Sequence, residues 1–404
     1  MKSYAEITQW LFSQLPVYQN QGATAYKPGL NKIINFVASL GNPHHNYPSI
    51  HIAGTNGKGS TAHMIASVLQ ESGSKIGLYT SPHLLDFSER IRIDGQTIEE
   101  EFVIAFVQKH QGYFLDEGLS FFEITVGMAF AYFAQQRVDY AVIEVGLGGR
   151  LDATNIITPI LSVITNIGLD HTQLLGQTHA AIAVEKAGII KSGIPVVIGE
   201  WREETRPVFE RIAEQKNAPI LLAEKQEIPE LSLDLHGQYQ IKNAQTAYTA
   251  LEFILGKTAL LGVLDGFRKV YLNTGLRGRW EILANSPLTI ADVTHNLEGF
   301  IEVLAQLKYF PKKQLHFVLG FVEGKTIDEI VALLPRTAKY YVSSPQIARG
   351  FSTEKLAVIM KKKGLKAQSF TSVGEAYLVA QKAADKTDLI YIGGSTFVVS
   401  EIIA

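Results

Sequence analysis

A glycine-rich segment with a lysine and several hydroxyl residues is the part of this sequence best suited to chemistry. It follows a β-rich run, IHIAG, and precedes a helical pattern. Glycines let backbone N–H groups approach phosphate oxygens, the helix start adds positive potential, and the lysine is a charged donor. We therefore predict a nucleotide site, with a plain Gly-rich turn as the alternative. Its residues are Gly54, Thr55, Asn56, Gly57, Lys58, Gly59, Ser60 and Thr61.

The spacing of this segment departs from the general phosphate-loop pattern. The position five residues before Gly57 is Ile52, and Gly59 separates Lys58 from Ser60. The usual pattern has a glycine at the first place and a hydroxyl residue directly after the lysine. The segment is therefore a variant of the phosphate loop.

Three candidate metal ligands lie at or just after the ends of predicted strands, namely Ser81, Glu144 and His171. Side chains from different strands of a parallel sheet converge at its carboxyl edge, which places these three beside the glycine-rich segment. Mg²⁺ needs few protein ligands because it keeps waters and phosphate oxygens. Ser81 as a turn residue and His171 as a cap are the alternatives. Glu144 lies within an apolar strand and needs a cation or metal as partner.

The elements that would position these residues follow an α/β pattern. Short β-rich runs cover 75–81, 139–146, 160–168 and 195–200 in addition to the run that ends at Gly54, and helical patterns cover 59–72, 122–136, 178–188 and 202–216. The runs are almost continuous in Val, Ile and Leu, as in strands covered on both faces. This alternation predicts a phosphate-loop domain with a largely parallel sheet.

A second, smaller domain is predicted after a glycine-rich segment at 273–279. New strand signals follow at 288–293, 315–321, 340–345 and 389–395, with amphipathic helices between them. We therefore expect an ATP-binding domain at 1–278 and a Rossmann-like domain at 279–404. The length of 404 residues, of which 46% are apolar, is sufficient for two cores.

Composition limits the partners. The 37 basic and 39 acidic residues provide no strong field for nucleic acid or an anionic membrane, so small solutes are expected. The chain has no cysteine, which excludes disulfides and thiolate ligands. The first 16 residues read as an amphipathic helix rather than a secretory signal, and we expect a soluble cytoplasmic protein.

Taken together, these motifs resemble the folate branch of the Mur ligase superfamily, the bifunctional dihydrofolate synthases/folylpolyglutamate synthases. The glycine-rich segment with its extra Gly59 resembles the family's ATP loop, and Ser81, Glu144 and His171 resemble its metal ligands. The resemblance implies ATP, one or two Mg²⁺ ions, and a carbamylated Lys186 (N6-carboxylysine) in Lys-Ala-Gly. From the residues alone, Lys186 is a surface lysine.

The resemblance also implies substrate and nucleotide contacts. The string from Arg150 to Asn155 resembles the pterin-binding loop of the bifunctional enzymes, and its presence favours that form over one that only extends glutamate tails. Val293 and Thr294 replace the family's usual glycine and alanine. The implied substrate residues are Gly29, Leu30, Phe121, Phe122, Glu123, Leu151, Asp152 and Ala153, and the further nucleotide residues are Asn243, Arg279, Asp292 and His295.

The implied activity is ATP-dependent addition of L-glutamate to 7,8-dihydropteroate and to reduced folates through an acyl phosphate. Lys58, Glu144, His171 and Lys186 would act in catalysis, and the protein would be a monomer. A folylpolyglutamate synthase with one activity and another Mur-type amino-acid ligase are the alternatives. A cell-wall ligase would normally have a further domain before the loop, where only 53 residues precede Gly54. A regulatory GTPase would need an Asn-Lys-x-Asp motif, which is absent.

Overall fold

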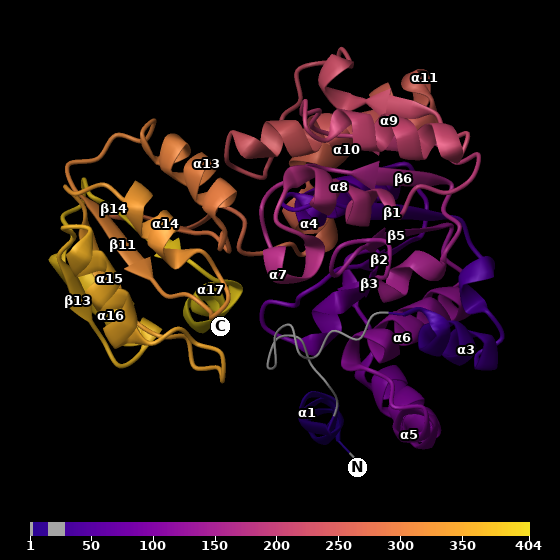
Figure 1. Cartoon of the computed structure of the whole chain (residues 1–404), viewed down its shortest axis with the longest axis horizontal. Coiled ribbons are helices and arrows are strands. Elements are labelled where there is room, and N and C mark those ends of the chain that lie inside the picture. The colour runs from indigo at the N-terminus through magenta and orange to yellow at the C-terminus, as the bar shows by residue number, and fades with distance from the viewer. Residues whose placement is uncertain (1–2, 15–28) are drawn as a thin grey trace. The chain divides into compact units, whose positions relative to one another are not determined.

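The computed structural model describes residues 3–14 and 29–404 (Figure 1). Contacts divide the chain into two compact units. The first comprises Met1–Asp234 and Gln240–Leu276, and the second comprises Leu235–Tyr239 and Arg277–Ala404. The last change of unit, between Leu276 and Arg277, falls close to the predicted boundary after residue 278. The short segment Leu235–Tyr239, which joins the second unit ahead of the rest of it, was not predicted.

A largely parallel sheet forms the centre of the first unit, as predicted. Among the described residues it has eight strands in the order β4-β3-β2-β5-β1-β6-β7-β8, in which β3 and β4 are antiparallel. In the view of Figure 1, α3, α5 and α6 lie to one side of the labelled strands and α9 and α10 to the other. The strands are β1 (Ser49–Ala53), β2 (Ile76–Tyr79), β3 (Ile91–Ile93), β4 (Gln96–Thr97), β5 (Tyr140–Glu144), β6 (Leu161–Ile164), β7 (Val196–Ile198) and β8 (Ile220–Leu222).

The helices of the first unit include all four that the sequence predicted there. Their bounds are α1 (Tyr4–Gln14), α3 (Asn31–Ser39), α4 (Lys58–Glu71), α5 (Glu100–Asp116), α6 (Phe121–Gln136), α7 (Thr172–Leu175), α8 (His179–Ala187), α9 (Arg206–Gln215), α10 (Tyr239–Leu255), α11 (Lys257–Leu261) and α12 (Val270–Thr274). Short 3-10 helices are η2 (Pro43–His45), η3 (Phe87–Arg90), η4 (Ala153–Ile156), η5 (Ala223–Lys225) and η6 (Leu264–Arg268).

The three central strands of this sheet end at the same edge. In the register of β1 with its neighbours, Ile52 pairs with Glu144 of β5, and Ala53 pairs with Ile164 of β6. Every residue of β1 and β6 is buried, because helices cover both faces of the sheet. The glycine-rich segment after β1 and Glu144 at the end of β5 therefore lie at one edge.

Local sequence chemistry fixes the helices that carry candidate residues. α6 begins with a capping box, in which Ser120 Oγ accepts from the Glu123 N–H and the Glu123 carboxylate accepts from the Ser120 N–H. Thr178 caps α8 by accepting from the Ala181 N–H. These caps set where Phe121, Phe122 and Lys186 lie along their helices.

The second unit has a smaller sheet with a Rossmann-like, mostly parallel arrangement, as predicted. Among the described residues its order is β13-β12-β11-β14-β10-β9, with β9 antiparallel to β10. α16 packs against β11 and β12. The elements are β9 (Glu281–Asn285), β10 (Leu288–Ala291), β11 (Leu315–Leu319), β12 (Lys339–Val342), β13 (Ala367–Ser369), β14 (Leu389–Gly393), α13 (Leu297–Leu307), α14 (Ile327–Leu333), α15 (Thr353–Lys362), α16 (Val373–Ala383) and α17 (Thr396–Ile403).

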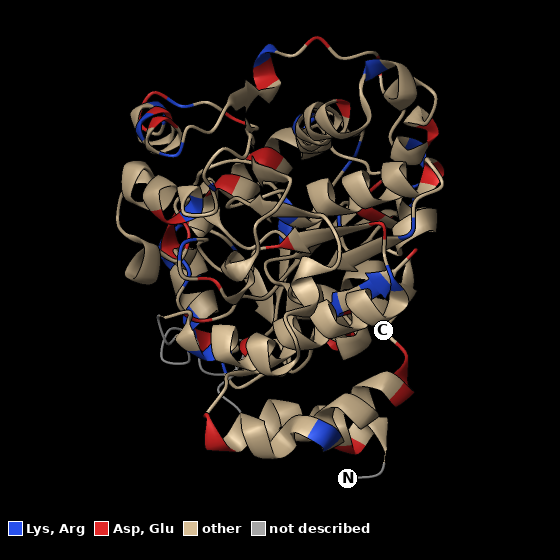
Figure 2. Ribbon diagram, turned by 90° about the vertical axis from the view of Figure 1, so that its right-hand side faces the viewer, with Lys and Arg blue, Asp and Glu red and all other residues tan. Residues whose placement is uncertain are grey.

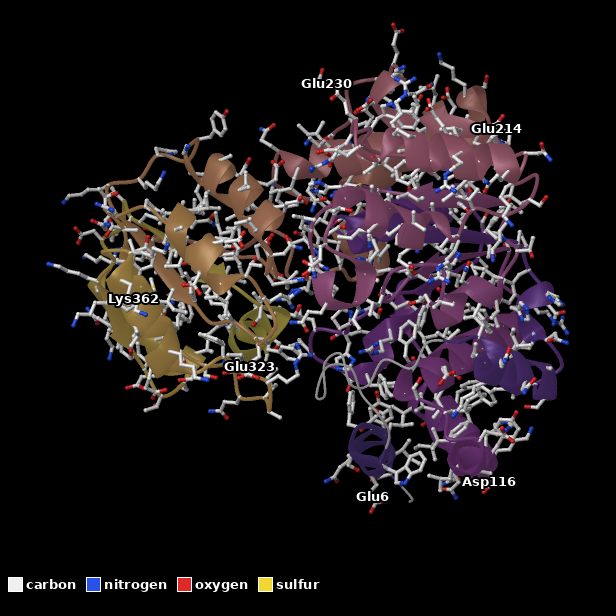
Figure 3. All side chains as sticks on the ribbon, in the orientation of Figure 1. Glu6, Asp116, Glu214, Glu230, Glu323 and Lys362 are labelled. Carbon is white, nitrogen blue, oxygen red and sulfur yellow. The ribbon has the colours of Figure 1, made fainter. Side chains whose placement is uncertain are left out.

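Basic and acidic residues alternate along the ribbon without separating into regions of one sign (Figure 2), in keeping with the net charge of −2. The labelled Glu6, Asp116 and Glu214 lie at the outside of the first unit in Figure 3, and all three are exposed. No helix within the described residues is long and apolar enough to cross a membrane. Charged residues that are buried, such as Glu144, Asp152, Lys186 and Asp292, are therefore exceptions in this protein.

Candidate active site

Two glycines give the loop after β1 its shape. Gly57 precedes α4 with a φ of +80°, a left-handed conformation that favours glycine. A Cβ at Gly57 would lie 2.1 Å from Asn243 Oδ1, and one at Gly54 would lie 1.8 Å from Thr165 Oγ1. The backbone is thus held close to its neighbours. Asn243, a predicted nucleotide residue, is brought against the loop.

Two lysines donate to a single carbonyl of this loop. Lys58 Nζ lies 3.0 Å and Lys186 Nζ 2.8 Å from Gly54 O, so the two amines are within about 6 Å of each other. Lys186 is only 4% exposed. Burial, followed by the charge of Lys58, lowers the pKa of Lys186 to about 7. Lys186 is therefore not the surface lysine that the residues alone indicated.

Residues that follow β6 form hydrogen bonds with the loop after β1. Asn166 Oδ1 accepts from the Asn56 N–H at 2.9 Å, and Thr165 Oγ1 donates to Asn56 O at 2.6 Å. Gly168 N donates to Thr55 Oγ1 at 2.9 Å. Sequence reasoning did not select Thr165 or Asn166. Their position at the end of a predicted strand, at the same sheet edge, was the available signal.

Residues near the start of α10 also contact the loop after β1 and the first turn of α4. Gln240 Nε2 lies 3.2 Å from Ser60 Oγ, and Asn243 Nδ2 donates to Gln240 Oε1 at 2.8 Å. Ser60 and Thr61 are buried in the first turn of α4, whereas Thr55 to Lys58 are partly exposed. The part of the loop open to a ligand therefore runs from Thr55 to Lys58.

Glu144 and Ser81 lie next to each other, as predicted. The Ser81 N–H donates to Glu144 Oε2 at 2.9 Å, and Glu144 is 4% exposed at the end of β5. Within the described part of the chain, no group of three or more His, Cys, Asp or Glu side chains could hold a metal. The predicted ligands Ser81, Glu144 and His171 include only two residues of these four types. The finding therefore does not test this predicted metal site.

His171 lies at the start of α7 with a φ of +51°, and its ring is 27% exposed. The backbone N–H of His171 donates to Asp170 Oδ1 at 2.8 Å, and the ring Nε2 lies 3.8 Å from Asp170 Oδ2. This ring–carboxylate distance is too long for a hydrogen bond, and the His171 side chain makes no cap hydrogen bond to α7, so the capping alternative gains no support. The role of His171 as a ligand stays a prediction.

The candidate substrate loop is fixed by Asp152. This carboxylate is 4% exposed, accepts from Leu147 N at 2.8 Å through Oδ2, and accepts from Thr154 through Oδ1. Burial raises its pKa, and these hydrogen bonds oppose that effect. A Cβ at Gly146 would lie 2.5 Å from the Phe122 ring, so the start of α6 lies against the start of this loop.

The same loop packs on the end of α8. The Arg150 N–H donates to Glu185 O at 2.7 Å, and the Arg150 side chain pairs with the Glu185 carboxylate at 2.9 Å. Asn155 Nδ2 donates to Gly188 O at 3.0 Å. The predicted substrate loop and the segment that carries Lys186 thus form one cluster within the first unit.

Other predicted substrate residues have structural contacts. Phe121 is buried and its ring lies 5.1 Å from the guanidinium of Arg90, whose Nε donates to His83 Nδ1 at 2.8 Å. The carboxylate of Glu123 serves the capping box of α6. Sequence reasoning did not select Arg90 or His83, and an arginine in a polar stretch gives no signal of burial.

The remaining predicted substrate residues lie at the edges of this region. Leu151 is partly buried and Ala153 is buried in η4, while Gly29 is exposed and Leu30 precedes α3. Tyr26, Lys27 and Pro28, which precede Gly29 in the sequence, lie outside the described residues. Substrate contacts of all these residues stay predictions.

In the second unit, Asp292 is an organising residue. It is 2% exposed, and its Oδ2 accepts from Tyr239 Oη at 2.6 Å and from Trp280 N at 2.8 Å. Its Oδ1 accepts from the backbone and side chain of Thr294. Threonine at this position thus supplies a hydroxyl that holds the loop. A direct contact of Asp292 with nucleotide stays a prediction.

Two other predicted nucleotide residues flank Asp292 along the chain. Arg279 is partly buried, with Nη1 3.4 Å from Gly278 O, and His295 Nδ1 lies 3.1 Å from Val293 O. Asn296 caps α13 by accepting from the Gly299 N–H at 2.9 Å. His295 therefore stands immediately before a helix start, a common place for anion contacts.

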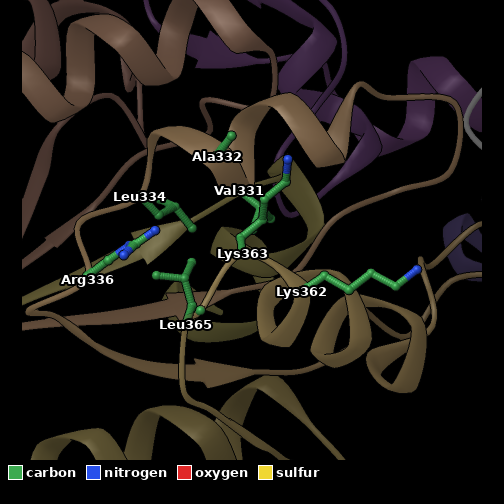
Figure 4. A pocket seen from close by; sticks show the side chains of 8 residues that line it. Val331, Ala332, Leu334, Arg336, Lys362, Lys363 and Leu365 are labelled. Atoms are coloured by element: carbon green, nitrogen blue, oxygen red, sulfur yellow. The ribbon is translucent and has the colours of Figure 1, made fainter.

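A pocket of about 360 Å³ lies elsewhere in the second unit (Figure 4). It is formed where α14 and α15 end, before β12 and β13 begin, whereas Asp292 follows the end of β10. The pocket is therefore at the amino edge of the sheet and is separate from the candidate residues. It is lined by Val331, Ala332, Leu334, Arg336, Lys362, Lys363, Gly364 and Leu365.

Comparison with known proteins agrees with this arrangement. Residues 52–220 match the Mur ligase middle domain, and residues 278–396 match the Mur ligase glutamate ligase domain. A dihydrofolate synthase/folylpolyglutamate synthase of Bacillus subtilis is 32% identical over 367 residues, which are 83% of this chain and 84% of that protein. The chain belongs to the dihydrofolate synthase/folylpolyglutamate synthase family of Mur ligases. This family member is an ATP-dependent ligase.

Solved structures support the family at the level of the whole chain. FolC of Escherichia coli, in complex with DHPP and ADP, has a TM-score of 0.87 and 30% identity, covering 100% of this chain and 97% of that one. A bifunctional enzyme with Mn, AMPPNP and L-glutamate bound has a TM-score of 0.86 and 28% identity, covering 100% and 98%.

One relative is longer. This ligase is 32% identical to a probable bifunctional folylpolyglutamate synthase/dihydropteroate synthase of Haloferax volcanii, and it spans about half (48%) of that protein's length. The part matched covers 93% of this chain. The second activity in that relative's name is therefore not carried over.

Proposed function

We propose that this ligase uses ATP and Mg²⁺ to add L-glutamate to 7,8-dihydropteroate and to reduced folates, through an acyl phosphate. One observation carries the proposal most strongly. Lys58 and Lys186 converge on Gly54 O in the loop before α4, and the loop held by Asp152 packs on the segment that carries Lys186. A site for a polyanion and a site for a second substrate are thus adjacent within the first unit.

The chemistry requires a carboxylate to attack the γ-phosphoryl group although both are anionic. Lys58 and the N–H groups at the start of α4 would neutralise the phosphates and orient them, which is most of the catalytic work in phosphoryl transfer. The glutamate amine then attacks the acyl carbon and phosphate leaves with one oxygen of the original carboxylate. ADP leaves when the acyl phosphate forms, so the products are the amide, ADP, inorganic phosphate and the proton lost by the amine.

The metal site would consist of Ser81, Glu144 and His171. Their oxygen atoms and imidazole are ligands of divalent ions, and a buried carboxylate such as Glu144 needs a positive partner. One or two Mg²⁺ ions would supply positive charge between the two anionic reactants. The proposal is supported by the hydrogen bond from the Ser81 backbone N–H to Glu144 Oε2 at 2.9 Å, which brings these two residues together.

Lys186 would be carbamylated. Its pKa of about 7 leaves a large fraction of neutral amine near neutral pH, and only the neutral amine adds to CO₂, giving a carbamate and a proton. The product is an anion that pairs favourably with Lys58 or a metal ion. This change would also remove the repulsion between the two ammonium groups.

In the second unit, we assign nucleotide contacts to Arg279 and His295. Asp292 would act mainly through the loop that it holds, because its two oxygens already accept four hydrogen bonds. Asn243 would act from the first unit, where it lies against Gly57. We propose that the protein acts as a monomer on small molecules.

Release of phosphate from ATP tests the proposal, measured with dihydropteroate and glutamate together and with each omitted. Release that requires both substrates is expected, and release that is indifferent to both contradicts the assignment. Release with reduced folates but not with dihydropteroate would instead identify an enzyme with folylpolyglutamate synthase activity alone. Asp152→Ala is expected to impair both reactions if both acids use the same loop.

A further inference from the structure

A chain of three buried polar residues runs from the central strand to the candidate substrate loop. His51 Nε2 of β1 lies 2.9 Å from Thr154 Oγ1, which donates to Asp152 Oδ1 at 2.5 Å. His51 and Thr154 are 0% exposed and Asp152 is 4% exposed. Neither His51 nor Thr154 has a part in the reaction proposed above, although both are connected to the residue that shapes its substrate loop.

The hydrogen atoms in this chain have a defined order. The single hydroxyl hydrogen of Thr154 is given to Asp152, so Thr154 Oγ1 must accept from His51. Burial, followed by the charge of Lys191, lowers the pKa of His51 to about 3, so the ring is neutral. A neutral imidazole has one N–H, and here it is on Nε2. Nδ1 then has only a lone pair.

The opposite order would leave a buried donor without an acceptor. If Asp152 were protonated and donated to Thr154, the hydroxyl would donate to His51 Nε2 and the ring hydrogen would move to Nδ1. His51 Nδ1 has no hydrogen-bond partner among the described residues. An orphan N–H in a core is rarer and costlier than an unused acceptor. The hydrogen bonds among His51, Thr154 and Asp152 therefore favour the ionised form of Asp152.

The second oxygen of Asp152 fixes the direction of the carboxylate. Oδ2 accepts from Leu147 N at 2.8 Å, and Oδ1 also accepts from Thr154 N at 3.0 Å. Lys186 and Tyr79 feel the charge of Asp152, and Lys191 lowers the pKa of His51. None of them bonds to Thr154, so the order of hydrogens depends on His51.

We propose that His51 and Thr154 are positioning residues, which keep Asp152 ionised and so fix the loop that this carboxylate closes. This inference rests on the proposed function where it assigns the substrate heterocycle to that loop. An ionised Asp152 accepts from the Leu147 N–H and from the N–H and hydroxyl of Thr154 at once, whereas a protonated carboxyl would have to use one of its oxygens as a donor. Loss of the network would therefore disturb the part of the site that takes the heterocycle rather than the parts for glutamate or ATP.

The tautomer of His51 can be observed without substrate. We would label histidine ring nitrogens with ¹⁵N in the full chain and assign His51 by comparison with His51→Gln. A neutral ring with hydrogen on Nε2 is expected throughout pH 5 to 9. A ring with hydrogen on Nδ1, or one that titrates near its usual pKa of about 6.5, would overturn the proposal.

Kinetics of Thr154 variants test the consequence for substrate. Thr154→Val keeps the shape and removes the hydroxyl, and we expect the KM for dihydropteroate to rise about tenfold while the KM for ATP changes by less than about twofold. Thr154→Ser keeps the hydroxyl and should restore values near those of the wild type. Equal changes in both KM values, or an unchanged KM for dihydropteroate in Thr154→Val, would contradict the proposal.

Two controls separate the possible failures. Thermal unfolding of Thr154→Val and Thr154→Ser shows whether a kinetic change reflects loss of fold. A wild-type enzyme that does not turn over dihydropteroate contradicts the proposed function, whereas the tautomer of His51 in the ligand-free protein decides on the network independently.

Discussion

At the scale of single residues, the contact of Lys58 and Lys186 with one carbonyl has a chemical consequence. Two ammonium groups at this distance repel each other, and burial adds a cost for the charge on Lys186. The pKa of Lys186 in the folded protein is below its unfolded value of 10.5. The neutral amine therefore predominates above about pH 7, and it is lost as the pH falls through this value.

Carbamylation of Lys186 should follow the same pH dependence. With ¹³C-bicarbonate, the carbamate signal in the ¹³C NMR spectrum is expected to grow from pH 6 to pH 8, because more of the amine becomes neutral. Lys186→Gln should abolish the signal. Lys269→Gln, which removes a lysine in a partly exposed ion pair with Glu71, is the control and should retain it. A signal that persists in Lys186→Gln contradicts the assignment.

Glu144→Gln tests the metal site at the same scale. The amide oxygen of glutamine can still accept from the Ser81 N–H, so the fold should be kept. Loss of the charge should weaken metal binding, and because the metal would neutralise charge that develops in the transition state, kcat should fall roughly a hundredfold or more. The measurement is turnover over a range of Mg²⁺ concentrations.

Asp265→Asn is the matched carboxylate control for this experiment. It breaks an exposed pair with Arg268 and should leave kcat almost unchanged. If Glu144→Gln also kept the kcat of the wild type and its dependence on Mg²⁺, Glu144 would not be a ligand.

At the scale of secondary structure, the central elements were predictable because their pattern is uniform. β1, β5 and β6 are mostly apolar and lie between helices, so their position and parallel direction follow from the sequence. The antiparallel β3 and β4 were missed, although Asp94-Gly95 between them is a strong turn signal. β13 was missed because it is short and largely exposed.

The candidate site was predictable only where its residues form a recognisable pattern in the sequence. The glycines and Lys58 form a contiguous motif, and Glu144 is marked by an apolar strand around it. Asn166 and Arg90 have no such mark, because their importance comes from which segments the fold brings beside them. The burial of Lys186 likewise depends on the packing of α8 against the loop after β1.

The loop before α4 provides a prediction at this scale. Gly57→Ala would strain a φ of +80° and place a Cβ 2.1 Å from Asn243 Oδ1. We expect the affinity for ATP, measured by calorimetry, to fall at least tenfold because the loop or Asn243 must move. Gly73→Ala, after the other end of the same helix, has a similar φ of +86° but open space around it.

The comparison of the two variants separates strain from collision. Both should lose stability by roughly 1 kcal/mol from the left-handed backbone. Only Gly57→Ala should lose affinity for ATP. Equal affinity in the two variants would show that the close approach of Asn243 to the loop is unimportant.

At the scale of the whole molecule, the chain passes between the two units more than once. The second unit consists of two separate segments, and Asp292 connects them. Tyr239, at the end of the short segment Leu235–Tyr239, and Trp280, soon after Arg277, both donate to its Oδ2. The second unit is therefore built from two separate parts of the chain that meet at one buried carboxylate.

Tyr239→Phe tests this function of Asp292. Removing one donor from a buried carboxylate should cost about 1–3 kcal/mol. Hydrogen exchange should accelerate in β10 and β14 and stay unchanged in β1 and β5 of the first unit. Tyr309→Phe, whose side chain is 79% exposed, is the control and should change neither unit. Unchanged exchange in β10 and β14 of Tyr239→Phe would contradict this function.

The acyl phosphate is the central claim about the whole enzyme, and oxygen transfer tests it most directly. Dihydropteroate labelled with ¹⁸O in its carboxylate is incubated with enzyme, ATP and L-glutamate, and the phosphate is analysed by mass spectrometry. Because phosphate leaves with an oxygen of the carboxylate, one ¹⁸O should appear in inorganic phosphate per amide formed. Phosphate without ¹⁸O, or label in AMP, would contradict the account.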